Sequence, residues 1–165
     1  LTAWQRYLGS VPGCDEGWGL YAESLADELG LMPTPEDRFG RLAARRWRLA
    51  RVLVDLGVHS RLPVPDDVAA LPGACREWNR ATVTAVLRHH TVISEGRLRF
   101  EVSRHLGWPA QPLAYAVGER VWQAGRRSAQ VQARTEGGEL DLRAFHNRGI
   151  DLGSVGLDLL ASALH

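Results

Sequence analysis

The spacing of apolar residues constrains the fold of this chain most strongly. From Glu16 to Leu29 apolar and small residues recur at helical intervals, and Gly30 follows where a left-handed helix cap would fall. No segment alternates apolar and polar residues over more than four positions, and no repeat of fixed period occurs. The pattern predicts an all-α fold, an irregular array of several helices.

A long helix is predicted to begin at Pro35. Thr34 supplies an N-cap hydroxyl, proline suits the first helical position, and Glu36 and Asp37 lie at the positive end of the helix dipole. Gly57 is expected to end this helix. The expected buried stripe consists of Phe39, Leu42, Ala43, Trp47, Ala50, Leu53 and Val54, with the arginines at 41, 45, 48 and 51 mostly outward.

Further helices are predicted along the rest of the chain. They comprise a short one from Pro65 that stops at Leu71, one through Trp78 and His89, one ending at Gly107, one seated by Pro109 or Pro112, and two over Asp141–Ile150 and Ser154–Leu164.

Charge and composition narrow the classes of partner. The 20 basic and 19 acidic residues nearly cancel, which argues against nucleic acid and against a membrane surface. The arginine-rich stretch around Arg45 could suggest a DNA-binding regulator, but a solvated helix face is favoured.

No apolar run could span a bilayer, and the N-terminus lacks a signal-peptide pattern, so a soluble, cytoplasmic chain is expected. Cys14 and Cys75 lie far apart and are expected to be free thiols.

Two carboxylates, Glu16 and Glu23, lie seven residues apart and are expected on nearly the same helix face. Gly17 and Gly19 would leave room beside the first of them, so Glu16 is a candidate zinc ligand. The alternative is that Glu16 opens its helix and complements the positive helix terminus, and on spacing alone this alternative is favoured.

His59 and Tyr115 are the other candidate site residues. Asp55 precedes His59 by four residues and could accept from the imidazole N–H, whereas a histidine at a helix C-terminus needs no such role. Tyr115 follows a proline-rich segment and could donate to an oxyanion, although most buried tyrosines bond a backbone carbonyl. His89 and His90 point about 100 degrees apart on a helix and are not expected to share one metal ion.

An ordered set of motifs extends through most of the chain. It comprises EGWGLYAE, DRFGRL, VDLGVH, PAQPLAYAVG and LDLRAFHN. The set resembles the C-terminal half of the bacterial domain of unknown function 885 family, which reads EGWALYAE, DR-GRL, VDTGLH, PGQALAYKIG and FDLRAFHD in the same order. One departure is Ala110, which stands where that family has glycine.

The resemblance implies a zincin-like metallopeptidase fold, with an upstream helix of the form HExxPGHH that carries histidine ligands and a general base. It implies that Glu16 completes a zinc site and that His59 and Tyr115 face the cleft as transition-state donors.

No HE pair occurs in this chain. We therefore expect residues 1–165 to be a single helical domain and a fragment or split part of a larger hydrolase of peptide substrates. Its partner would be the missing N-terminal portion, or a separate subunit that carries the HE-containing helix. The alternative is a non-catalytic helical interaction module.

Overall fold

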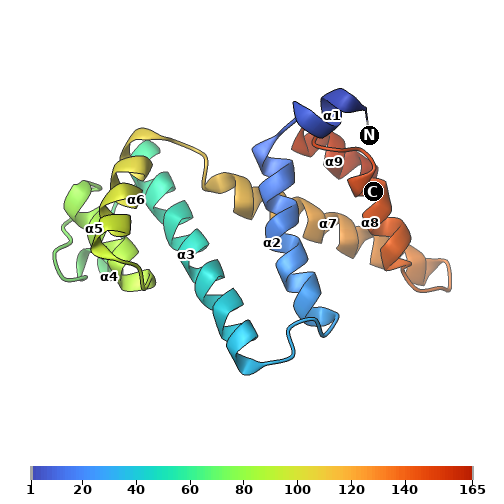
Figure 1. The fold of residues 1–165 in the computed structure, drawn as a ribbon, viewed down its shortest axis with the longest axis horizontal. Coiled ribbons are helices and arrows are strands. Elements are labelled where there is room, and N and C mark those ends of the chain that lie inside the picture. Colours follow the sequence, from blue (N-terminus) through green and yellow to red (C-terminus); the bar gives the residue numbers. More distant parts are fainter. Residues whose placement is uncertain (1, 165) are drawn as a thin grey trace. The chain divides into compact units, whose positions relative to one another are not determined.

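The computed structural model describes residues 2–164, and every regular element within them is a helix (Figure 1), which confirms the all-α prediction. The helices are α1 (Ala3–Tyr7), α2 (Pro12–Glu28), α3 (Pro35–His59), α4 (Asp66–Ala69), α5 (Arg80–His90), α6 (Glu95–Gly107), α7 (Leu113–Thr135), α8 (Leu142–Ile150) and α9 (Leu157–Leu164).

Contacts within the chain group its residues into two compact units. Unit 1 comprises Leu1–Leu29 and Ala114–His165, and unit 2 comprises Gly30–Leu113. The sequence predicts a single domain, and this remains a prediction. Each unit has a hydrophobic core of its own.

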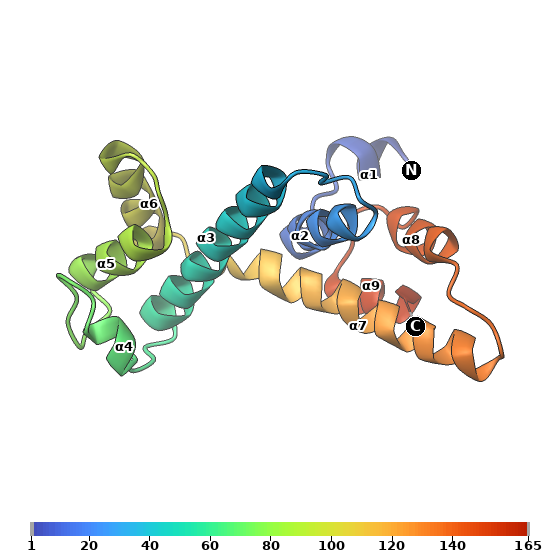
Figure 2. The ribbon, with the colours of Figure 1, turned by 90° about the horizontal axis from the view of Figure 1, so that it is seen from below.

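In unit 1, α2, α8 and α9 gather along α7 (Figures 1 and 2). The core residues come from all four helices and are Cys14, Tyr21, Trp122, Ala129, Phe145, Leu160 and Leu164. Helix α2 begins at Pro12 and not at Glu16, because proline at its first turn starts the helix one turn before the acidic residue. The prediction that Glu16 opens the helix was therefore wrong.

Two glycines set the closest approach of α2 to α7. A Cβ added at Gly17 would collide with the backbone of Gly118, and one added at Gly118 would collide with the Gly13 carbonyl oxygen. Gly17 therefore serves helix packing, and the space beside it is filled by α7. A Cβ at Gly19 would meet no atom within 4 Å, so only Gly19 leaves open space of the kind that the sequence suggested for both glycines.

In unit 2, the C-terminal half of α3 packs against α5 and α6. Its core residues are Ala50, Val54, Val64, Val68, Val83, Val86, Leu87, Leu98 and Val102. The predicted N-cap at Thr34 is present, with its hydroxyl accepting from the Asp37 N–H at 3.2 Å, and the Asp37 side chain completes a capping box. Gly57 does not end α3, which continues to His59, and the missing side chain at Gly57 makes room for the indole of Trp78.

The expected burial of the α3 stripe is correct only in the C-terminal half of that helix. Ala50 and Val54 are buried, but Phe39 and Leu42 are 74% and 54% exposed. Figures 1 and 2 show the first turns of α3 reaching beyond α5 and α6, the helices of unit 2 that cover the second half. A helical repeat identifies a face but does not say how far neighbouring helices extend along it.

Arg51 is buried, contrary to the prediction that it faces outward. Its Nε donates to Nε2 of His105 at 3.1 Å, and it lies 3.9 Å from a carboxylate oxygen of Glu101, which has no exposed surface. Arg97 and Arg104 also pair with Glu101, at 2.9 and 3.6 Å. The buried carboxylate offsets the cost of removing the guanidinium from water. Burial, reinforced by Arg51, lowers the pKa of His105 to about 4.

His105 should make folding stability dependent on pH. Its pKa is about 4 in the folded chain and about 6.5 in an unfolded one, so the unfolded chain binds more protons between these values. The contribution of the neutral His105 ring to folding stability is fully present above about pH 6.5 and is lost as pH falls toward about 4. At about 1.4 kcal/mol per pKa unit, the free energy of unfolding should fall by about 3 kcal/mol over this pH range. Urea unfolding at several pH values should show this loss in the wild type and a smaller one in His105→Gln, which keeps an acceptor for Arg51. Parallel pH profiles for the two proteins would contradict it.

The two glycines of EGWGLYAE should respond oppositely to alanine. Gly17→Ala places a methyl group against the α7 backbone, so we expect the free energy of unfolding to fall by about 1–3 kcal/mol. Gly19→Ala is the matched control, because it meets no atom and restores helix propensity, and it should raise the same free energy by about 0.5–1 kcal/mol. Thermal and urea unfolding measure both changes. Equal effects of the two substitutions would refute the close approach.

Candidate functional site

Glu16 lies in the second turn of α2 and is half-buried. The acidic residue in the first turn is Asp15, which accepts a hydrogen bond from the Ser10 hydroxyl at 2.7 Å. No hydrogen bond or ion pair joins Glu16 to another of the described residues. Neither helix capping nor an ion pair with a described side chain therefore explains why this carboxylate is half-buried.

Tyr115 is the third residue of α7 and is half-buried. Gly118, three residues further along α7, is the residue that contacts Gly13 and Gly17 of α2. The close approach of the glycines thus joins the helix that carries Glu16 to the helix that carries Tyr115. Pro112 directly precedes α7, as one of the two predicted starts required.

His59 is the last residue of α3 and is held by a backbone carbonyl. Its Nε2 lies 2.8 Å from the carbonyl oxygen of His105, so Nε2 carries the proton and donates it there. The remaining ring nitrogen, Nδ1, is the one available to a ligand. Asp55 lies 3.9 Å from Nε2, too far for a hydrogen bond, so it does not accept from the imidazole as the spacing of the two residues would allow.

Asp55 instead fixes the PAQ segment of unit 2. Both of its carboxylate oxygens accept from the backbone N–H of Ala110, at 3.0 and 3.1 Å. The side chains of Arg51 and Arg104 both donate to the Gln111 amide oxygen, at 3.1 and 3.0 Å. The sequence assigned no role to Arg104 or Gln111, because these contacts join residues that no helical spacing relates.

A polar and aromatic cluster in unit 1 joins two of the sequence motifs. The Tyr21 hydroxyl of EGWGLYAE lies 2.9 Å from Nε2 of His146 in LDLRAFHN. Arg126 donates to the same hydroxyl at 3.4 Å and pairs with Glu28 at 2.7 Å. Burial raises the pKa of Tyr21, and burial and then Arg126 lower the pKa of His146. The sequence analysis missed this cluster, because 125 residues separate Tyr21 from His146.

The remaining candidates of the sequence analysis have structural neighbours. Asp141 caps α8 by accepting from the Ala144 N–H at 3.0 Å, as expected of a helix start. The rings of His89 and His90 are packed edge to face. Within residues 2–164, no group of three or more His, Cys, Asp or Glu side chains is close enough to hold a metal ion. In the same range, no helix is long and apolar enough to cross a membrane.

Ala110 adopts a left-handed backbone conformation with φ of 69°. An L-residue with a Cβ pays roughly 1 kcal/mol there, and glycine does not. Ala110→Gly should therefore raise the free energy of unfolding by about 0.5–1 kcal/mol. The extra conformational entropy that glycine gives the unfolded chain reduces this gain. Ala81→Gly, at an exposed helical position, is the control and should lower stability by about 1 kcal/mol. Chemical unfolding measures the stability of both variants. A loss of stability in Ala110→Gly would contradict the predicted relief of backbone strain.

Comparisons with known proteins place the chain among bacterial sequences. No curated protein matches it. Among solved structures it is similar to one described as "the putative lipoprotein from Colwellia psychrerythraea", with 28% identity and a TM-score of 0.76. The match covers 93% of this chain but only 23% of that one, so the chain spans about a quarter of the length of this relative. Residues 1–164 match the family described as bacterial protein of unknown function (DUF885), and the chain therefore belongs to this family.

Proposed function

We propose that this chain is the C-terminal part of a zinc-dependent, peptidase-like hydrolase. In this proposal Glu16 supplies one metal ligand, His59 and Tyr115 supply cleft walls, and the remaining ligands come from another stretch of polypeptide. The observation that carries the proposal is the half-buried carboxylate of Glu16, which lies on a packed helix and has no partner among the described side chains. Because the chain spans only part of its solved relative, the activity belongs to the completed protein and not to this chain alone.

Glu16 has the chemistry that a zinc ligand needs. A carboxylate oxygen is an ordinary zinc ligand, and a catalytic zinc site uses three protein ligands and leaves one position for water or substrate. The glycine contact between α2 and α7 holds the backbone under Glu16 rigidly, and open space beside Gly19 leaves room on that helix. One carboxylate cannot hold zinc usefully by itself. The histidines of an HE-containing helix are the complement that the family resemblance implies.

His59 and Tyr115 would act on the substrate. With its Nε2–H donated to the His105 carbonyl, His59 would present Nδ1, which donates only after protonation. The Tyr115 phenol can donate to a developing oxyanion. Bound zinc would polarise the scissile carbonyl and lower the pKa of a bound water. The substrates proposed are peptides, and a cytoplasmic location remains part of the same proposal.

A second candidate function is a non-catalytic interaction module that retains the family fold. The exposed apolar side chains of Phe39 and Leu42 favour it, because they line one hollow together and a contiguous exposed apolar patch marks an interaction site. The two functions differ in what they require of Glu16, and this difference provides the test.

Zinc titration of the completed protein tests the proposal. The chain would be combined with a polypeptide bearing the HE-containing helix, in cis from the parent gene or in trans. We expect a gain in zinc affinity over either part alone, and a loss of about 100-fold in Glu16→Gln. Glu23→Gln, which removes a carboxylate two turns further along α2, is the matched control and should bind zinc normally.

The same completed protein distinguishes a metal-ligand role from a role in the cleft wall. Tyr115→Phe and His59→Gln should lower kcat for peptide hydrolysis by roughly 100-fold while zinc affinity stays unchanged. Unaltered zinc binding in Glu16→Gln would exclude the ligand role and leave the interaction module.

A further inference from the structure

A long apolar groove runs along α3 on unit 2, formed by two adjoining hollows that share Leu42, Arg46 and His90. The hollows have volumes of about 400 and 620 Å³. All of their lining residues belong to unit 2. We call this surface the α3 groove.

The α3 groove has the dimensions of a helix-binding site. Its lining on α3 extends from Phe39 to Leu53, which at 1.5 Å per residue is about 21 Å, or roughly four helical turns. Phe39 and Leu42 are 74% and 54% exposed, and Val92 at the edge of the second hollow is fully exposed. An extended, open apolar surface of this length fits the apolar face of an amphipathic helix better than a compact ligand that would be enclosed.

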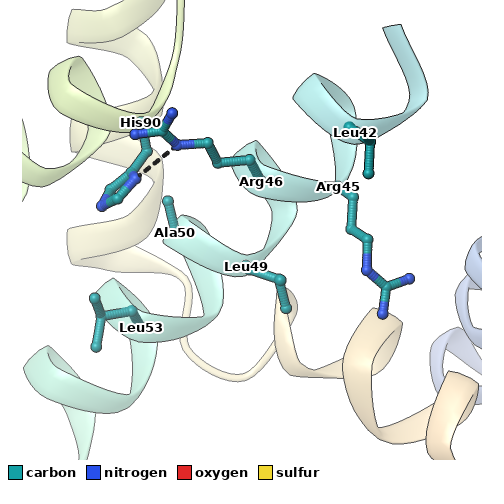
Figure 3. A pocket seen from close by; sticks show the side chains of 7 residues that line it. All are labelled: Leu42, Arg45, Arg46, Leu49, Ala50, Leu53 and His90. Carbon is teal, nitrogen blue, oxygen red and sulfur yellow. Dashed lines mark hydrogen bonds between the residues drawn. The ribbon is translucent and has the colours of Figure 1, made fainter. Parts of the chain in front are cut away.

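The charges of the α3 groove are of one sign. Of its lining residues, all of them described, Arg45 and Arg46 are cationic and none is acidic. Figure 3 shows Arg46 turned toward His90, while Arg45 extends away from that histidine. The Nε of Arg46 donates to His90 Nδ1 at 3.1 Å, and one terminal nitrogen reaches the His89 carbonyl at 3.5 Å. A guanidinium has five N–H donors, so Arg46 retains donors for a carboxylate.

We propose that the α3 groove docks an amphipathic helix whose apolar stripe is flanked by acidic residues, supplied by the part of a family protein that lies outside the matched region. The solved relative carries most of its chain outside the match, so proteins of this fold contain further elements that could cover these helices. The inference rests on the proposed need for a completing polypeptide, but not on zinc or on Glu16. Leucines of the bound helix would cover Phe39 and Leu42, and its acidic residues would meet Arg46.

Peptide binding to the complete 165-residue chain tests this docking surface. The probes are fluorescent stapled helices of about 18 residues with leucines at i, i+3, i+4 and i+7, flanked by glutamate in one peptide and by lysine in the other. We expect the glutamate peptide to bind about tenfold more tightly, with an advantage that shrinks as salt rises. Arg46→Gln should reduce this preference.

Matched variants locate the binding. Leu42→Asp should weaken the glutamate peptide about tenfold. Leu62→Asp, at an exposed leucine of unit 2 outside the α3 groove, should not. Thermal unfolding of both variants shows whether each is folded, and Phe39→Ser provides a second groove variant if Leu42→Asp unfolds.

Several results would overturn the proposal. These are equal affinity for the two peptides, no saturable binding of either, or binding indifferent to both groove variants. Displacement of the glutamate peptide by dodecanoate would identify a small-molecule site instead, and Leu42-dependent self-association in sedimentation would identify a second copy as the occupant. Because Glu16→Gln leaves the α3 groove intact, loss of zinc binding in that variant and loss of peptide binding in Leu42→Asp report on separate claims.

Discussion

The contact between Gly17 and Gly118 determines how unit 1 can present its polar residues. Without side chains at either position, α2 and α7 approach to backbone contact, and this crossing fixes the turn of α2 that holds Glu16. Further along α2, Tyr21 stacks against Trp122 with ring centroids 5.6 Å apart and joins His146 by a hydrogen bond. The interior of unit 1 is therefore occupied by aromatic packing, and Glu16 is left without a partner in the described residues.

The family motifs make physical sense as pairs of contacts rather than as separate sites. In unit 1, EGWGLYAE meets the end of PAQPLAYAVG through the two glycines and meets LDLRAFHN through Tyr21 and His146. In unit 2, VDLGVH meets the beginning of PAQPLAYAVG through the carboxylate of Asp55. Motif order along a sequence cannot reveal such pairs. It can only show that the same residue types recur, which is why the resemblance identified the family without explaining most of its residues.

Local chemistry accounts for what the sequence predicted well. The Thr34 N-cap, the prolines at the starts of α3 and α7 and the Asp141 cap act on their own backbone neighbours, so a reader of the sequence can place them. The errors at Gly57 and Arg51 have the opposite origin. At Gly57 the relevant condition is the Trp78 indole, which occupies the space that a side chain would take, and at Arg51 it is the buried carboxylate of Glu101. Both conditions depend on residues more than twenty positions away.

The uneven burial of α3 connects its packing to its proposed partner. The C-terminal half is covered by α5 and α6 and carries the buried Arg51, whereas the N-terminal half exposes Phe39 and Leu42. Helix propensity and the Thr34 cap can sustain the first turns, but they do not explain why apolar residues continue there with the same spacing. A stripe that keeps its period beyond its own core is explained if a second surface covers it. Arg46 beside that stripe then favours an acidic partner over a basic one, because like charges at a desolvated interface are costly.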